Sequence, residues 1–188
     1  MIRSEARFSV SGQVEVFLRG QGADVPMARF HNAVQESGCT AMAQALYSPS
    51  ARLNAMYILY TSTGSALDLG ADAGGLTAED LRDLSDPTHN LVRVPVTQIV
   101  TSGNTLTLQG ITDAAKALSG SLVFNESSAV YGVGLVYAPS EDDPGQDILF
   151  SAANLKTPGG DDLLITKVAN AQIGINWTLS ISIGTQEQ

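Results

Sequence analysis

The sequence predicts a mainly-β protein: an antiparallel, jelly-roll-like β-sandwich with one or two short helices and long loops. The strongest sign is strict alternation near the end of the chain. From Ala171 to Gly184, aliphatic or aromatic residues take every second position, and small or polar residues take the positions between. A period of two places these sets on opposite faces of a strand. Roughly eight or nine short strands without a βα rhythm complete a pattern typical of a sandwich or barrel.

We expect this alternating segment to be the central strand of the sheet, with its apolar face inward. A second alternating segment, Arg7–Leu18, predicts a strand near the other end of the chain. Gly12 interrupts its apolar row, and a glycine inside a strand is a position where a bulge can form. The core and assembly candidates on the two strands are Phe8, Val10, Val14, Val16, Ile173, Ile175, Trp177, Leu179 and Ile181.

The first half of the chain between these strands predicts two helices and two strands. Residues 20–26 suggest a loop, and residues 30–46 change to helical spacing, with Ser37 as the N-cap of a helix over 38–47. The apolar run 56–61 predicts a buried strand, followed by a long loop over 62–75. Thr77 caps a second short helix that ends at Leu84. Residues 91–100 predict a strand in which Pro95 indicates an edge or a bulge.

The second half predicts a hairpin and several short strands. Ser102, Gly103 and Asn104 form the turn that joins strand 91–100 to residues 105–109. Residues 111–119 form a connector. Further strands are expected over 122–124, 129–138, 148–150 and 163–168, with both faces of 129–138 covered. An acidic turn over 140–147 and a loop over 155–160 separate them.

Composition limits the classes of partner. The chain has 188 residues, enough for one domain, which we divide into an N-terminal arm and first strand, residues 1–18, and a sandwich, residues 19–188. Only 15% of residues are charged, and the formal net charge is -9. Such a chain is repelled by nucleic acid and anionic lipid, and its ten basic residues form no cluster. No apolar stretch is long enough to span a membrane, so we expect a soluble protein that folds in the cytoplasm.

No pattern of catalytic, cofactor-binding or metal-ligating residues stands out, so we expect no enzyme. His31 and His89 lack a partner at a nucleophile or metal spacing and are expected to be polar surface or loop residues. Cys39 is expected to be a buried helix cysteine rather than a reactive thiol. Trp177 is expected to anchor the core rather than a subunit contact. Two acidic turns could supply calcium ligands but are favoured as solvated loops: Asp142, Asp143, Asp147, Asp161 and Asp162.

Three segments carry a resemblance to a known family. The first is Asn32-Ala33-Val34 with Gly38, the Ala- and Leu-rich helix, the strand MYILYTS and a Gly-rich loop. The second is NESSAVYGVGL, residues 125–135. The third is DILFSAANLKTPGGDDLLITK followed by IGINWTLSIS, ending at Ser182. In that order they resemble the small virion structural proteins of tailed bacteriophages, over residues 32–183. The chain departs from the family at Gly132-Val133, where members often have Glu-Ala, so no role is carried over for that glutamate.

The resemblance implies a structural component of the viral particle and no enzyme. The first expectation is a capsid decoration, or cement, protein on the virion surface, made in the cytoplasm of the host bacterium. Its partners would be the major capsid protein, or another virion protein, and copies of itself in a homotrimer. A tail, collar or fibre-base subunit is the alternative. A carbohydrate-binding receptor domain is more remote, because aromatic residues are only 6% of the chain.

The first strand allows two interpretations. Residues 1–18 reach beyond their own sandwich to a neighbouring subunit or to the capsid, as in donor-strand addition. Alternatively, they form an ordinary first strand that pairs within its own sheet. Deleting residues 2–18 would separate the two, because the first interpretation leaves a folded domain that no longer binds capsids, whereas the second leaves a less stable fold.

Overall fold

A computed structural model of the chain describes residues 5–20, 23–32, 34, 38–40, 42, 52–64, 66–69, 76–82, 88–112, 116–117, 127–166 and 171–186. Its ten strands form one antiparallel sheet with the order β2-β1-β10-β5-β4-β3-β7-β8, while β6 pairs with β4 and β9 with β7. The strands are β1 Glu5–Arg19, β2 Asp24–Asn32, β3 Leu53–Thr61, β4 His89–Ser102, β5 Thr105–Ile111, β6 Lys116–Ala117, β7 Ala129–Tyr137, β8 Ile148–Asn154, β9 Ile165–Thr166 and β10 Gln172–Gln186. Helix α2 spans Ala78–Arg82, and a 3₁₀ turn spans Pro144–Gln146.

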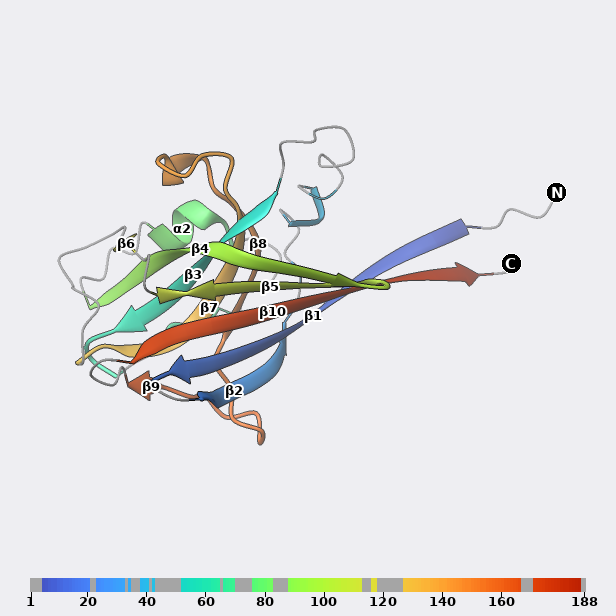
Figure 1. Ribbon diagram of the computed structural model, residues 1–188. Helices are drawn as coiled ribbons and strands as arrows, with labels where there is room; N and C mark the ends of the chain where they lie inside the picture. Colours follow the sequence, from blue (N-terminus) through green and yellow to red (C-terminus); the bar gives the residue numbers. More distant parts are fainter. Residues whose placement is uncertain are drawn as a thin grey trace.

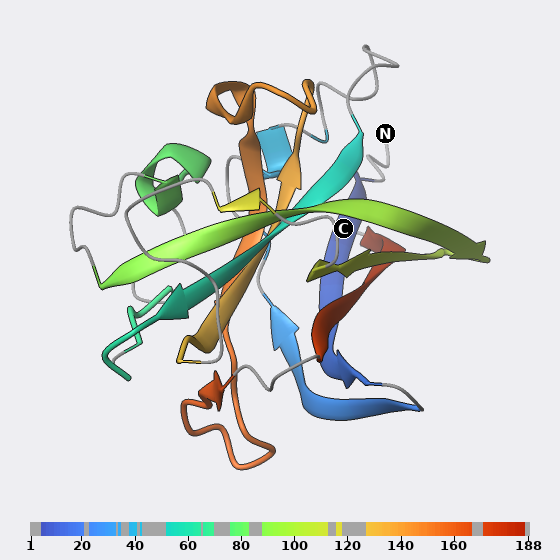
Figure 2. The same cartoon turned by 60° about the vertical axis from the view of Figure 1, so that its left-hand side comes forward.

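The sheet curls into a half-barrel because β4 belongs to both of its halves (Figures 1 and 2). Up to Pro95, β4 pairs with β3, and beyond it β4 pairs with β5, with a register irregularity between Val96 and Gln98. The predicted bulge near Pro95 is confirmed. A bridge between Val34 and Ser151 brings the two ends of the strand order together. The mainly-β antiparallel prediction is confirmed, whereas a separation into two facing sheets is not evident.

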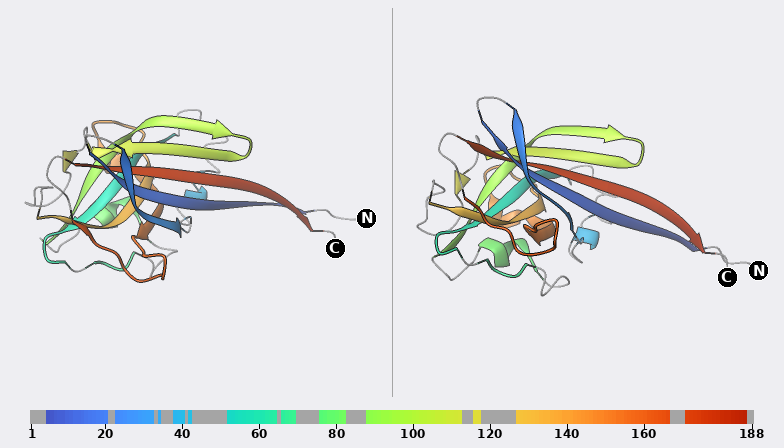
Figure 3. Two further views of the ribbon diagram at one scale, coloured as in Figure 1. Left: turned by 60° about the horizontal axis from the view of Figure 1, so that its bottom comes forward. Right: turned by 90° about the horizontal axis from the view of Figure 1, so that it is seen from below.

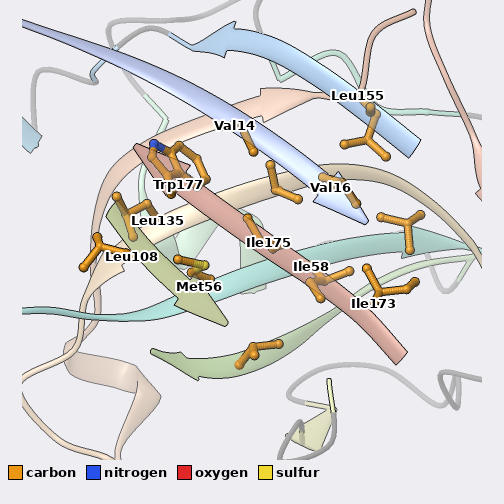
Figure 4. Close-up of a cluster of buried hydrophobic side chains, with 14 of the residues drawn as sticks. Val14, Val16, Met56, Ile58, Leu108, Leu135, Leu155, Ile173, Ile175 and Trp177 are labelled. Atoms are coloured by element: carbon orange, nitrogen blue, oxygen red, sulfur yellow. The ribbon is translucent and has the colours of Figure 1, made fainter. Parts of the chain in front are cut away.

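The alternating segment at the end of the chain is β10, and it lies inside the sheet as predicted. It pairs with β1 along its whole length and with β5 from Gly174 to Ser180. Its apolar face lines the interior of the half-barrel, where Ile173, Ile175 and Trp177 are fully buried (Figure 4). Val14 and Val16 of β1 lie beside them and are also fully buried. The register matches the hydrophobic alternation, because a one-residue shift would turn the polar face inward.

The prediction that Ile181 points into the core is wrong. Ile181 lies on the same face as Trp177, but its side chain is 42% exposed. The reason is strand length: β10 has 15 residues and therefore extends about 50 Å, which carries its end past the packed body. Alternation reports which face a residue lies on, and only the tertiary structure decides whether that face is covered.

The half of the sheet formed by β3 and β7 is buried on both faces. Its inner face belongs to the core around Trp177. Its outer face packs against Leu81 of α2 and against Leu69. All residues of β7 after Ala129 are buried, which confirms the covered faces predicted for 129–138. The helix start is also as predicted: Thr77 Oγ1 accepts a hydrogen bond from the Asp80 amide at 3.2 Å, and the Asp80 carboxylate accepts one from the Thr77 amide at 2.8 Å.

Two strands of the sheet were not predicted from the sequence. Asp24–Asn32 forms β2, where a loop and then helical spacing were expected. It is an edge strand with only Ala28 and Phe30 buried, so its alternation is weak. The short β6 lies in the expected connector. Residues 38–40 and 42 are helical, as expected; the rest of that helix and the strand over 122–124 lie outside the described residues.

Gly12 has another role than the expected bulge. The irregularity between β1 and β2 lies at Val16 and Phe17 instead. The Asn32 side chain occupies the space beside Gly12, where a Cβ atom would meet Asn32 Oδ1 at 1.9 Å. Asn32 Nδ2 donates to the Ser151 hydroxyl, close to the bridge that joins Val34 to β8. The glycine therefore makes room for the side chain that links the two ends of the curled sheet.

Candidate functional site

The most distinctive surface is an arm that projects from the body. It consists of residues 5–11 of β1, residues 97–106 of the β4–β5 hairpin, and residues 180–186 of β10. Figure 3 shows the ribbon of β1 and β10 and the hairpin extending from the body in the same direction. The two-stranded ribbon formed by β1 and β10 reaches further than the β4–β5 hairpin. β5 pairs with β10 only as far as Ser180, whereas β1 pairs with β10 as far as Gln186.

The hairpin is built by its turn and fastened at its tip. Gly103 and Asn104 form the loop, and Gly103 has a φ of 57°, which favours glycine. Asn104 then holds β10 through two hydrogen bonds: its carbonyl accepts from the Ile181 amide at 3.0 Å, and its Nδ2 donates to the Ile181 carbonyl at 2.8 Å. The predicted hairpin is confirmed, and its tip is attached to the central strand rather than free.

The arm is almost without charge. Residues 94–112 and 168–186 contain no Asp, Glu, Lys or Arg, and only Glu5 and Arg7 carry charge on the arm. These two cancel, so the net charge of -9 belongs entirely to the rest of the chain. Apolar side chains are exposed here: Ile99 by 58%, Val100 by 49% and Ile181 by 42%. The remaining exposed residues are largely Ser and Thr, and a Ser9–Ser182 hydroxyl pair at 2.6 Å links the two ribbon strands.

A separate feature, on the body of the protein, is a buried ion pair that holds the acidic loop 139–147. Arg93 donates to both carboxylate oxygens of Asp147, at 2.9 and 3.0 Å, and also to the backbone carbonyls of Ser140 and Glu141. The Asp147 side chain is fully buried. Tyr57 donates to the same carboxylate at 2.6 Å, and Arg82 donates to the Pro144 carbonyl. The Asp147 carboxylate and the Tyr57 hydroxyl are bound to partners within the protein, so we interpret this network as a structural attachment of the loop.

The electrostatics around Tyr57 agree with a structural role. Burial raises the pKa of Tyr57, and its hydrogen bond to the Asp147 carboxylate raises the pKa further. The phenol therefore stays protonated at neutral pH and keeps donating to Asp147. A general base would need a pKa near neutrality, so this pattern favours structure over proton transfer.

The acidic residues of the two loops do not converge on one point. Asp147 is bound by Arg93, and Asp162 forms an ion pair with Lys156 at 2.5 Å. Asp143 accepts hydrogen bonds from the Gly145 amide and the Gln146 side chain. Among the described residues, no group of three or more His, Cys, Asp or Glu could hold a metal ion.

Two further sequence expectations are corrected. His89 is not a surface residue: it is 5% exposed, packs edge-on against Tyr131 and contacts the Thr88 hydroxyl at 3.1 Å. Cys39 is exposed rather than buried. The reason is its neighbour, because Gly38 is pressed against the Phe150 backbone, which turns the next side chain outward. His31 is exposed on β2, as expected.

The structure divides the predicted core and assembly residues into two groups. Val14, Val16, Ile173, Ile175, Trp177 and Leu179 are buried and can only stabilise the fold. Val10 is half-buried and Ile181 is exposed, and both lie on the arm; the side chain of Phe8 lies outside the described structure. The hairpin 97–106 was not among the candidates. The signal that could have identified it is the absence of charge over residues 94–112 in an acidic chain.

We compared the chain with protein-family models, with curated proteins and with solved structures, and none of them matches it. The described helices include none that is long and apolar enough to cross a membrane. What the fold and the site define is therefore a general class: an antiparallel half-barrel with a projecting, nearly uncharged β-arm.

Proposed function

We propose that this protein is a structural component of a tailed-bacteriophage virion, and specifically a capsid decoration protein. In this role it binds the outer surface of the assembled head and stabilises contacts between major capsid subunits. The family resemblance of the sequence suggests the virion, and one structural observation supports an assembly role: the nearly uncharged arm that projects from a well-packed body. No catalytic step is part of the proposal.

The composition of the arm is suited to contact with protein rather than with water. A soluble surface typically has about 25–35% charged residues, whereas the cores of protein interfaces are depleted in charge. The arm combines exposed Ile99, Val100 and Ile181 with uncharged hydroxyl groups. The rest of the surface carries the acidic charge that keeps the chain soluble before it assembles. We therefore propose the arm as the contact with other virion proteins.

Head binding tests this proposal. Purified heads that lack the protein are mixed with it, and bound protein is measured after sedimentation of the heads. We expect saturable binding by the native chain and a loss of binding for Ile99→Asp. Leu164→Asp is the matched control, because Leu164 is exposed on the body at 36%. Absence of binding by the native protein, or equal binding by the two variants, would contradict the proposal.

A tail, collar or fibre-base subunit is distinguished by copy number. A decoration protein covers the head and is present in many copies per virion, while a tail component is present in few. Quantitative mass spectrometry of purified virions measures this directly, and a low count would exclude the decoration role. The carbohydrate-binding alternative loses support, because the aromatic side chains whose burial is described are all buried, including Trp177 and Tyr131.

A further inference from the structure

The two lateral edges of the sheet near the arm differ in how they are protected. Along β2, the outer edge carries Asp24, Pro26 and Arg29, which are residues that discourage pairing with another chain. Along β4, the segment Thr97–Ser102 has the sequence TQIVTS, without charge, proline or glycine. Natural sheets rarely leave such an edge exposed, and an unprotected edge of this kind is usually covered by another strand.

The β4 segment is open along its whole length. β3 pairs with β4 only as far as Pro95, and no described residue pairs with the same side of the strand beyond that point. All residues from Thr97 to Ser102 are exposed. Its composition of β-branched and polar residues favours an extended strand. The segment therefore presents a row of backbone hydrogen-bond donors and acceptors, with the exposed side chains of Ile99 and Val100 at its centre.

A second open edge lies on the opposite side of the same sheet. β2 pairs with β1 only from Gly12 onward, so the outer side of Glu5–Ser11 has no strand against it among the described residues. The strands between the two open edges are ordered β1-β10-β5-β4, and each neighbouring pair is antiparallel. Because this number of strands is even, β1 and β4 run in opposite directions.

This geometry identifies a partner for each edge. Rotation about an axis parallel to the strands preserves their directions, so a rotated copy presents its β1 antiparallel to β4 of the first copy. We infer that the open edge of β4 in one copy binds the open edge of β1 in the next copy, with Gln98–Ser102 opposite Arg7–Ser11, so that the arms of a ring of copies form one continuous antiparallel sheet. Such a head-to-tail contact covers both open edges and closes on itself under cyclic symmetry.

The side chains indicate a register. Ile99 is opposite Leu108, which is opposite Trp177, so Ile99 lies on the inner face; Val10 lies on that face too, opposite Ile181. Placing Ile99 opposite Val10 pairs the two apolar residues and sets Val100 opposite Ser9. The only charged residues on the two open edges are Glu5 and Arg7, whose charges cancel, so two acidic molecules approach at this surface without net local repulsion.

Disulfide trapping tests the contact with the isolated protein. In a Cys39→Ser background, Ser9→Cys and Val100→Cys are made as separate single variants and assembled together. We expect cross-linked dimers in the mixture and none in either variant alone. Ser9→Cys mixed with Thr101→Cys is the matched control, since these residues lie on opposite faces and should not cross-link. A dimer formed by Val100→Cys alone would indicate two-fold pairing of β4 with itself and overturn the head-to-tail contact.

A charge on the edge provides an independent measurement. Val100→Lys should reduce the native mass in solution from an oligomer to a monomer, because a lysine on an edge strand opposes pairing. Val25→Lys is the matched control: Val25 is similarly exposed, at 54%, but lies on the protected β2 edge. An equal effect of both substitutions, or a monomeric native protein at its highest soluble concentration, would overturn the inference.

The inference rests on the assembly role proposed above for the arm, and it adds that the arm also binds a second copy of the same chain. The experiments use no capsid, so their failure can be distinguished from a failure of head binding. Protein that binds heads but does not cross-link would leave the decoration proposal intact and refute the ring.

Discussion

The ring of Phe17 on β1 covers Gly174 on β10, and the two residues are direct partners in the sheet register. A Cβ atom on Gly174 would lie 2.2 Å from Phe17 Cζ, which is far inside van der Waals contact. Phe17 is only 3% exposed although it lies on the outer face of the sheet. The glycine therefore provides the space in which a large apolar ring closes over the central strand.

Gly174→Ala is expected to destabilise the protein by about 1–3 kcal/mol, because the added methyl group displaces the Phe17 ring. Phe17→Leu in the same chain should reduce the cost of Gly174→Ala. Denaturant unfolding of the two single variants and the double variant measures this coupling. Gly20→Ala is the control, since no atom lies within 4 Å of its Cβ position, and it should change stability by less than about 0.5 kcal/mol. Additive effects at Phe17 and Gly174 would contradict the packing described.

Trp177→Ala is expected to cost about 3–5 kcal/mol, because the side chain is fully buried in the half-barrel. Trp177→Phe should cost less, since Trp177 Nε1 has no hydrogen-bond partner among the described residues and only ring volume is lost. Ile181→Ala, on the same face of β10, should cost less than about 1 kcal/mol because that side chain is exposed. Equal losses for Trp177→Ala and Ile181→Ala in thermal unfolding would show that the arm is packed.

Arg93→Met is expected to destabilise the protein by about 3–5 kcal/mol, because it leaves the buried Asp147 carboxylate without its cation. Lys156→Met tests an ion pair of the same type at the surface, with Asp162, and should cost less than about 1 kcal/mol. Chemical denaturation compares the two. Similar small losses would mean that Asp147 does not depend on Arg93.

Alkaline pH should destabilise the fold through Tyr57. Its pKa is raised in the folded protein above the ordinary value of 10.0, so its contribution to stability is complete below that pH. The contribution is then lost as the pH rises through the folded pKa, since the unfolded chain ionises first. We expect the urea midpoint to fall as the pH rises above about 10, and to fall less steeply for Tyr57→Phe. Burial also raises the pKa of Tyr60 and Tyr137, which are present in both proteins and contribute equally to the pH dependence. If the urea midpoint falls equally with pH in both proteins, Tyr57 does not contribute to the alkaline destabilisation.

Deletion of residues 2–18 is expected to unfold the protein. The deleted part includes Val14 and Val16, which are fully buried, and the strand that pairs with β10 along its length. Circular dichroism of the truncated chain checks this. A folded truncated chain would support the other interpretation, in which the whole segment serves a neighbour. In the structure, the boundary between arm and body lies within this segment. Residues from Gly12 onward belong to the body, while Glu5–Ser11 belong to the arm.

Local patterns in the sequence were sufficient for the elements whose physics is local. The alternation of β10, the Gly103-Asn104 hairpin turn and the Thr77 cap each depend on neighbouring residues, and each was predicted from them. The edge strand β2 was missed because an edge strand with one thinly covered face does not need regular alternation. The burial of His89 and the exposure of Cys39 were mispredicted because they depend on contacts with Tyr131 and on the placement of Gly38.

The sequence by itself determined which face of each long strand is apolar and that the segments around the hairpin and β10 carry no charge. Only the tertiary structure decided where the body ends along those strands. Trp177 and Ile181 belong to one alternating row, yet one is fully buried and the other is exposed. The physical reason is that periodicity follows from the backbone of a single strand, whereas burial requires atoms from other strands, and beyond Leu179 the body no longer supplies them.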